Sequence, residues 1–262
     1  MTDHPTHRSR ARRVPATLLA LTFLAITALA GLVQGLSGFG SALVAVPLMS
    51  LLLPMEQVVP LMVLLGIGMS SLNLLHLRRS LSLKPVLPLI GGYLLGTPLG
   101  LYFLIDAPEV WVKLTLGLFL SGYAALSLAG RTLQPAWLRY HPIGIGTGSG
   151  ALGAAFSTNG PPVILHVAAQ QWSADQQKAA LSLFFVAAGL ITASAHGISG
   201  LLNLKVAEQA LMALPMLITG TWLGITLYRR LDDHNYRRLT FLLVLAMGLL
   251  MSAGAIEMLY QR

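Results

Sequence analysis

Long apolar runs separated by short polar loops fill most of this 262-residue chain. A helix needs about 20 mainly apolar residues to cross the hydrocarbon core of a bilayer. Eight segments come close to that length or exceed it: Ala16–Leu53, which glycines interrupt, Val58–Leu77, Pro85–Ile105, Val110–Ala129, Ile143–Ala169, Ala179–Ile198, Val206–Leu227 and Leu239–Leu259. No loop between them has room for a soluble domain. The pattern therefore predicts an all-α polytopic membrane protein.

Two of these segments share a glycine pattern, which indicates an internal repeat. The matching positions, each pair 115 residues apart, are Gly31 with Gly146, Gly35 with Gly150, Gly38 with Gly153, and Pro47 with Pro162. We predict two repeated halves, each with about four hydrophobic segments and each opening with the glycine-rich one. The predicted divisions are a disordered cytoplasmic tail at 1–15, a first half at 16–130, a linker loop at 131–142 and a second half at 143–262.

Each glycine-rich segment has two interpretations. Glycines three or four residues apart share one face of a helix and let a second backbone approach, which fits a kinked, tightly packed membrane helix. The alternative is a broken helix whose ends meet near the middle of the membrane, as in many secondary transporters. Pro47, and the turn-forming Asn159-Gly160 followed by Pro161, favour the break. A half-helix starting near Pro161 would offer an anion its partially positive amino end.

Charged residues make up only 10% of the chain, against 55% hydrophobic residues, and the net charge is +8. The basic residues lie in loops, and no basic face alternates with aromatics, so we expect no nucleic-acid partner. The basic loops share the cytoplasmic side if the second glycine-rich segment re-enters the membrane as a hairpin, and a first hairpin would make the halves inverted repeats. We expect a multi-pass protein of the cell (inner) membrane with a cytoplasmic N-terminus. The sequence leaves open whether each glycine-rich segment crosses the membrane or re-enters it.

Hydrogen-bond donors gather in the two glycine-rich segments. Ser37, Ser41, Ser157, Thr158 and Asn159 offer hydroxyl or amide groups, and the glycines offer backbone N–H groups. The oxygens of an oxyanion only accept hydrogen bonds, so this composition suits a small anion. Neither segment contains a carboxylate, and the chain has no cysteine, so we expect no metal site and no cofactor.

His76 and His196 lie near the ends of corresponding segments in the two halves. Hydrogen bonding between helices, or for His76 a position at the membrane edge beside Arg78 and Arg79, explains them without a further role. Because histidine titrates near neutral pH, both are also candidates for proton coupling.

The motifs Gly35-Leu-Ser-Gly38-Phe-Gly40 and Gly160-Pro161-Pro162, with the four-plus-four layout, resemble the TauE/SafE family of membrane permeases, also called the sulfite exporter family. The resemblance extends over most of the chain. It implies an ion-gradient-driven carrier of small sulfur-containing or carboxylate anions, such as sulfite or organosulfonates. Carried over by position, it implies a substrate site made of Gly35, Gly38, Gly40, Gly150, Gly153, Asn159 and Gly160. The three residues after Gly153 depart from the glycine-richer second motif of the family, so the particular substrate stays open.

We therefore expect a secondary transporter, an exporter of such anions by alternating access, with a proton or another ion as coupling partner, and not an enzyme. A passive anion channel would use the same glycine-lined backbone. An intramembrane serine hydrolase would use Ser149 with His196, although the glycine expected two residues before such a serine is Thr147. The expected partners are a small anion and the lipid bilayer, and the glycine faces would also serve a homodimer.

Overall fold

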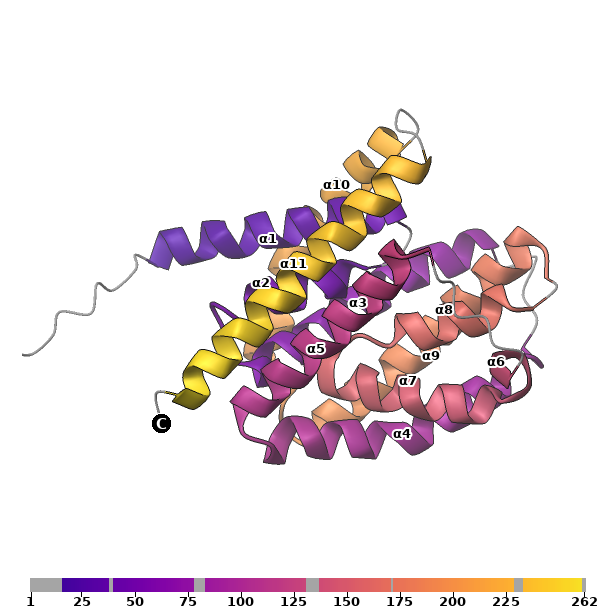
Figure 1. The fold of residues 1–262 in the computed structure, drawn as a ribbon, viewed down its shortest axis with the longest axis horizontal. Coiled ribbons are helices and arrows are strands. Elements are labelled where there is room, and N and C mark those ends of the chain that lie inside the picture. Colours follow the sequence, from indigo (N-terminus) through magenta and orange to yellow (C-terminus); the bar gives the residue numbers. More distant parts are fainter. Residues whose placement is uncertain are drawn as a thin grey trace, which may run out of the picture.

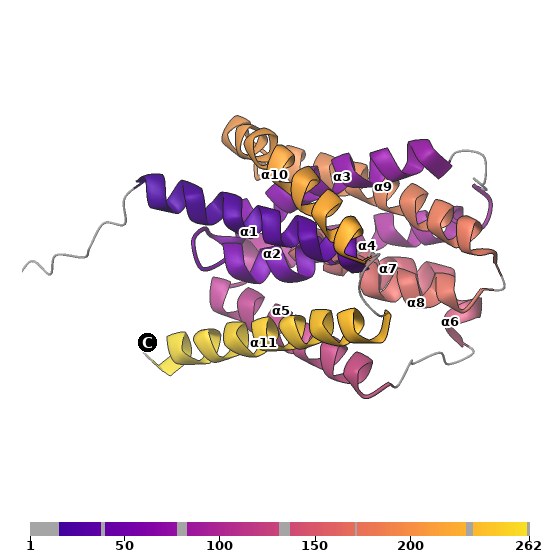
Figure 2. The ribbon, with the colours of Figure 1, turned by 90° about the horizontal axis from the view of Figure 1, so that it is seen from above.

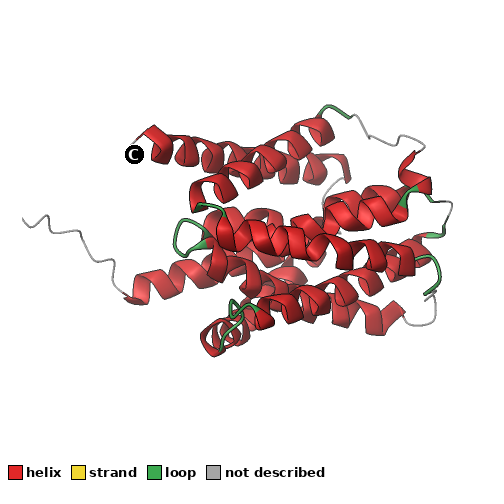
Figure 3. Ribbon diagram, turned by 90° about the horizontal axis from the view of Figure 1, so that it is seen from below, coloured by secondary structure: helices red, strands yellow, loops and turns green. Residues whose placement is uncertain are grey.

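The computed structural model describes residues 16–37, 40–77, 83–130, 137–170, 172–228 and 233–260. All regular secondary structure in those residues is helical (Figure 1, Figure 3). The helices are α1 (Ala16–Ser37), α2 (Ser41–Met49), α3 (Met55–Leu77), α4 (Leu87–Asp106), α5 (Glu109–Leu128), α6 (Trp137–Tyr140), α7 (Pro142–Phe156), α8 (Gly160–Ala168), α9 (Ala174–Ile198), α10 (Leu204–Tyr228) and α11 (Asp233–Tyr260). The predicted tail at 1–15 and residues 131–136 of the predicted linker lie outside the described residues.

Six of the described helices are long and apolar enough to cross a membrane: α1, α4, α5, α9, α10 and α11. The helix α3 contains a shorter apolar stretch, Met55–Ser71. Large apolar side chains remain exposed on these helices, such as Leu95 on α4 and Trp222 on α10. Exposed apolar surface of this kind is expected where a helix faces lipid. These observations confirm the predicted all-α, multi-pass membrane protein.

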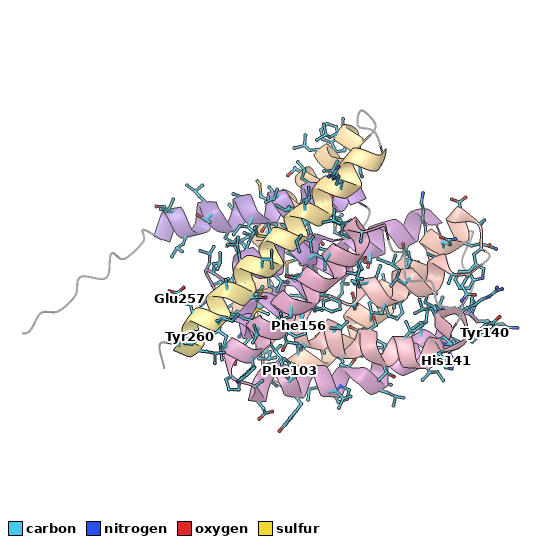
Figure 4. All side chains as sticks on the ribbon, in the orientation of Figure 1. Phe103, Tyr140, His141, Phe156, Glu257 and Tyr260 are labelled. Atoms are coloured by element: carbon cyan, nitrogen blue, oxygen red, sulfur yellow. The ribbon has the colours of Figure 1, made fainter. Side chains whose placement is uncertain are left out.

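The long helices pack in pairs that join the two predicted halves of the chain. The helix α4 lies along α7, α1 along α10, α5 along α11 and α3 along α9. Figure 2 shows the last two pairs side by side. At the end of α7, Phe156 packs edge-on against Phe103 of α4, with ring centroids 6.0 Å apart (Figure 4). Two buried apolar clusters fill the interior, one that includes α2 and α3 and one that includes α8 and α9.

Glycines bring two of these pairs into backbone-to-backbone contact. A β-carbon on Gly96 of α4 would overlap the Thr147 carbonyl group of α7, and one on Gly35 of α1 would overlap the Thr221 carbonyl group of α10. The same holds for the contacts at Gly31, Gly92, Gly100, Gly146, Gly150, Gly220 and Gly224. Only a residue without a side chain permits so close an approach. Most of the regularly spaced glycines in these helices therefore serve helix packing.

The helices begin and end at two opposite ends of the bundle. The start of α1 and the end of α11 lie at the same end, on the left in Figure 1 and Figure 2. The helices α3, α5 and α10 end at the opposite end, and α7 starts there. The segments α1–α2 and α7–α8 therefore enter the bundle from opposite ends.

Candidate functional site

Both glycine-rich segments are interrupted as helices. The helix α1 ends at Ser37 and α2 begins at Ser41, after Gly40 with a φ of 106°. After α7, Ser157 adopts a left-handed φ of 54°, and α8 begins at Gly160. Left-handed backbone is uncommon for a residue other than glycine, and such strain tends to occur at functional sites.

In each interrupted segment the chain turns back on itself. The backbone N–H of Ser41 donates a hydrogen bond to Gln34 Oε1 at 3.1 Å, which ties the start of α2 to α1. In the second segment, the Ser149 hydroxyl of α7 donates to the carbonyl of Asn159 at the start of α8. In each segment, a side chain of the first helix thus holds the start of the second.

A cavity of about 110 Å³ lies where the two interruptions meet. One water molecule requires roughly 10–15 Å³, so this space is large enough for a small ion. The first segment contributes Gln34, Gly40, Ser41, Ala42 and Leu43; the second contributes Gly153, Ser157, Thr158, Asn159, Gly160 and Pro161; and α3, α4 and α9 contribute Met62, Val63, Gly66, Ile67, Met69, Ser70, Tyr93, Phe185, Gly189 and Thr192. None of these lining residues carries a charge.

The amino ends of two short helices open onto this cavity. Residues at the start of α2 and of α8 line it, and no side chain caps either helix. The amino end of a helix carries about half a positive elementary charge and unpaired N–H groups. The two helix ends together therefore create a positive electrostatic potential in a cavity whose lining side chains are uncharged.

Tyr93 of α4 connects the second interruption to α9. Its hydroxyl oxygen lies 2.7 Å from Thr192 Oγ1, and Asn159 donates an amide N–H to it at 3.5 Å. The ring meets Phe184 edge-on, with centroids 5.5 Å apart. A β-carbon at Gly153 would overlap the Tyr93 hydroxyl. Three separate elements thus meet at the polar side of the cavity.

Eight of the twelve predicted substrate residues line the cavity: Gly40, Ser41, Gly153, Ser157, Thr158, Asn159, Gly160 and Pro161. Gly35 and Gly150 lie instead in the α1–α10 and α7–α4 contacts, and we leave them out of the site. Gly38 and the side chain of Ser37 lie outside the described residues.

The cavity residues that sequence reasoning missed include Gln34, Tyr93, Phe185 and Thr192. Gln34 carried a usable signal, because it is a polar residue inside the first repeated motif. The other three lie on helices α4 and α9, outside both motifs, and no local pattern distinguishes them from their neighbours.

The two residues of the alternative hydrolase do not bond to each other. His196 is fully buried, and its Nε2 lies 3.0 Å from the carbonyl oxygen of Ala154 on α7. A carbonyl oxygen only accepts, so Nε2 is the donor in this contact. Its Nδ1 has no hydrogen-bond partner among the described residues. Ser149 donates to the Asn159 carbonyl, and the side chain of His76 lies outside the described part of the chain.

The chain matches the family model described as Sulfite exporter TauE/SafE over residues 23–251. It belongs to the sulfite exporter TauE/SafE family. The match confirms the resemblance of the two glycine-rich motifs to this family. TauE/SafE membership implies a membrane transporter of the sulfite-exporter type, with a small sulfur-containing anion as its substrate and the lipid bilayer as its surroundings. No curated protein and no solved structure gives a significant match.

Proposed function

We propose that this TauE/SafE protein is a secondary transporter, and not an enzyme, that exports small sulfur-containing or carboxylate anions by alternating access. Sulfite and small organosulfonates are the first candidates. The observation that carries the proposal is the cavity, because both helix interruptions reach it and its polar lining consists of uncharged groups. Hydroxyl, amide and backbone N–H donors suit an ion whose oxygens only accept hydrogen bonds.

The side chains of Ser41, Ser157 and Asn159 are our candidates for direct contact with the anion. The backbone N–H of Ser41 is bound to Gln34, and Thr158 donates its hydroxyl to the Phe156 carbonyl at 3.0 Å, so neither donor is free. In α8 the second and third residues are prolines, which lack N–H groups. The amino end of α8 therefore has two fewer backbone donors, and we expect side chains to carry more of the recognition there.

The helix packing supports an inverted repeat with re-entrant hairpins. Exchanging the two halves turns the α1–α10 pair into the α7–α4 pair and leaves the pairs α3–α9 and α5–α11 unchanged. The segments α1–α2 and α7–α8 also enter from opposite ends of the bundle (Figure 1). Inverted repeats around a central site are common in secondary transporters, in which one group of helices rocks against another around that site. We therefore propose that the interruptions lie near the midplane of the membrane.

The glycine contacts indicate which helices move as units. Where a β-carbon would overlap backbone atoms, as at Gly96 and Gly35, the two helices pack backbone against backbone, and separating them would break these close contacts. We therefore take α4 with α7, and α1 with α10, as rigid units. Each unit contains helices from both halves of the sequence, so the rocking motion runs between these units and not between the sequence halves.

Basic residues indicate how the bundle is oriented in the membrane, and His196 is the candidate for proton coupling. The starts of α4 and α11, together with α6, lie at the end of the bundle opposite the start of α1 (Figure 1). Lys84 precedes α4, Arg139 lies in α6 and Arg238 lies near the start of α11, and the positive-inside rule assigns this basic end to the cytoplasm. Under this assignment α1 begins at the outer face, whereas the sequence predicts a cytoplasmic N-terminus. Proton coupling would use the unpaired Nδ1 of His196, one helical turn from Thr192 of the cavity.

Reconstitution into liposomes tests the function directly. Uptake of labelled sulfite and of a small organosulfonate is measured with and without an imposed pH gradient. Accumulation above the outside concentration, driven by the gradient, is the expected result. Flux that only equalises the anion concentrations on the two sides would favour a passive channel over a coupled carrier. Folded protein that moves no anion would refute the proposal.

A further inference from the structure

Asn159 stands where asparagine normally caps a helix, yet its side chain makes no capping bond. An N-cap asparagine usually accepts a hydrogen bond from the N–H of the second or third helical residue. In α8 these residues are Pro161 and Pro162, which have no N–H to donate. The two prolines therefore leave the Asn159 amide available for other partners.

One partner of that amide comes from a distant part of the chain. Asn159 Nδ2 donates to the Tyr93 hydroxyl oxygen at 3.5 Å, and Tyr93 lies on α4, in the other half of the sequence. The same hydroxyl lies 2.7 Å from Thr192 Oγ1 of α9. The Tyr93 hydroxyl oxygen accepts a hydrogen bond from Asn159, and its own O–H can donate one to Thr192 Oγ1. An amide nitrogen has two N–H groups, so Asn159 keeps a second one.

The position of the Tyr93 hydroxyl is fixed from several sides. The backbone of Tyr93 packs against Gly146 and Gly150 of α7, where a β-carbon would overlap or crowd it. The ring rests edge-on against Phe184. Gly153 gives the hydroxyl its room, since a β-carbon there would occupy the same space. Tyr93 lines the cavity but is only 1% exposed, so nearly all of its surface packs against protein groups.

We propose that Tyr93 is a positioning residue for substrate binding. Its hydroxyl, held by Thr192 and accommodated by Gly153, orients the Asn159 amide so that the second N–H binds an oxygen of the anion. This inference rests on the proposed function of an anion carrier. It adds to that function a residue outside both glycine-rich motifs, and it gives Gly153 a reason to be glycine that differs from helix packing.

Tyr93→Phe tests the proposal, because it keeps the ring against Phe184 and removes only the hydroxyl. The KM for sulfite uptake into proteoliposomes should rise roughly 2- to 12-fold, the effect of one hydrogen bond, with an unchanged maximal rate. In a protein that already carries Asn159→Ala, the same change should add nothing, because the group that Tyr93 positions is gone. Tyr102→Phe is the matched control, since Tyr102 lies on the same helix with 69% of its surface exposed, and its KM should equal that of the wild type.

Two results would overturn the proposal. One is an unchanged KM for Tyr93→Phe, and the other is an equal rise of KM in the wild-type and Asn159→Ala backgrounds. A double-mutant cycle of thermal unfolding, on the purified single and double variants, measures the interaction between Tyr93 and Asn159 without a transport assay. If the wild type moves no anion, the proposed function fails. The unfolding cycle then still supports the link if the two changes are non-additive, and refutes it if they are additive.

Discussion

Replacing Gly96 by alanine tests whether backbone contact between α4 and α7 stabilises the fold. The added β-carbon would overlap the Thr147 carbonyl oxygen and would lie 2.7 Å from the carbonyl carbon and 2.9 Å from the Ala151 nitrogen. All three are backbone atoms, so no side-chain rotation relieves the overlap. Overpacking of this kind costs roughly 1–3 kcal/mol, whereas alanine gains about 1 kcal/mol of helix propensity over glycine. Because the overlapped backbone atoms cannot turn aside, we take the upper part of that cost, about 2–3 kcal/mol, which leaves a net destabilisation of about 1–2 kcal/mol.

Gly91→Ala is the matched control, because Gly91 lies on the same helix and a β-carbon there would meet nothing within 4 Å. This variant should be as stable as the wild type or up to about 1 kcal/mol more stable. Unfolding of both variants is followed in detergent micelles by circular dichroism during heating. Opposite signs of the two shifts are expected. Equal shifts, or a Gly96→Ala protein as stable as the wild type, would refute the close contact between the helices.

Four further predictions concern the site and its orientation. Asn159→Asp should abolish sulfite uptake by inserted protein, because a carboxylate repels an anion, and retained uptake would remove this residue from the site. Gly153→Ala should raise the KM for sulfite as Tyr93→Phe does, because the new methyl group displaces the hydroxyl, and an unchanged KM would contradict this. The chain has no cysteine, so Thr17→Cys and Lys84→Cys each give a single label site; an impermeant maleimide on intact spheroplasts should label only the first, and the reverse pattern would invert our orientation. His196→Gln should flatten the dependence of uptake on pH near neutrality, and an unchanged pH profile would end the coupling role.

Local signals in the sequence were sufficient for the fold class and for the interruptions. Long apolar runs predicted the long helices, because the ability of a segment to cross a membrane depends on the length and composition of one continuous stretch of residues. The turn formers Asn159 and Gly160 predicted a new helix near Pro161, and α8 begins at Gly160. The four-residue spacing of glycines likewise predicted close approach of helices, which Gly35 and Gly150 make.

The sequence could not distinguish glycines of the cavity from glycines of the helix contacts. Gly150 and Gly153 belong to the same motif, yet the first faces the backbone of α4 and the second faces the Tyr93 hydroxyl. Which way each points depends on how α7 is rotated, and that rotation is set by a helix from the other half of the chain. Tyr93 itself is separated by 66 residues from Asn159 and by 99 from Thr192, so no local pattern links them.

An uncharged cavity also suits the release of an anion by a carrier. A fixed cation 4 Å from a bound anion, at an effective dielectric constant of about 20, would contribute roughly 4 kcal/mol of attraction. That energy would have to be overcome each time the anion leaves, and a factor of ten in rate is lost for each 1.4 kcal/mol or so. Two helix ends with about half a charge each, and side chains such as Asn159, spread a weaker attraction over the cavity. Replacing a lining residue by arginine would therefore strengthen binding and slow release, so tight binding and fast transport would change in opposite directions.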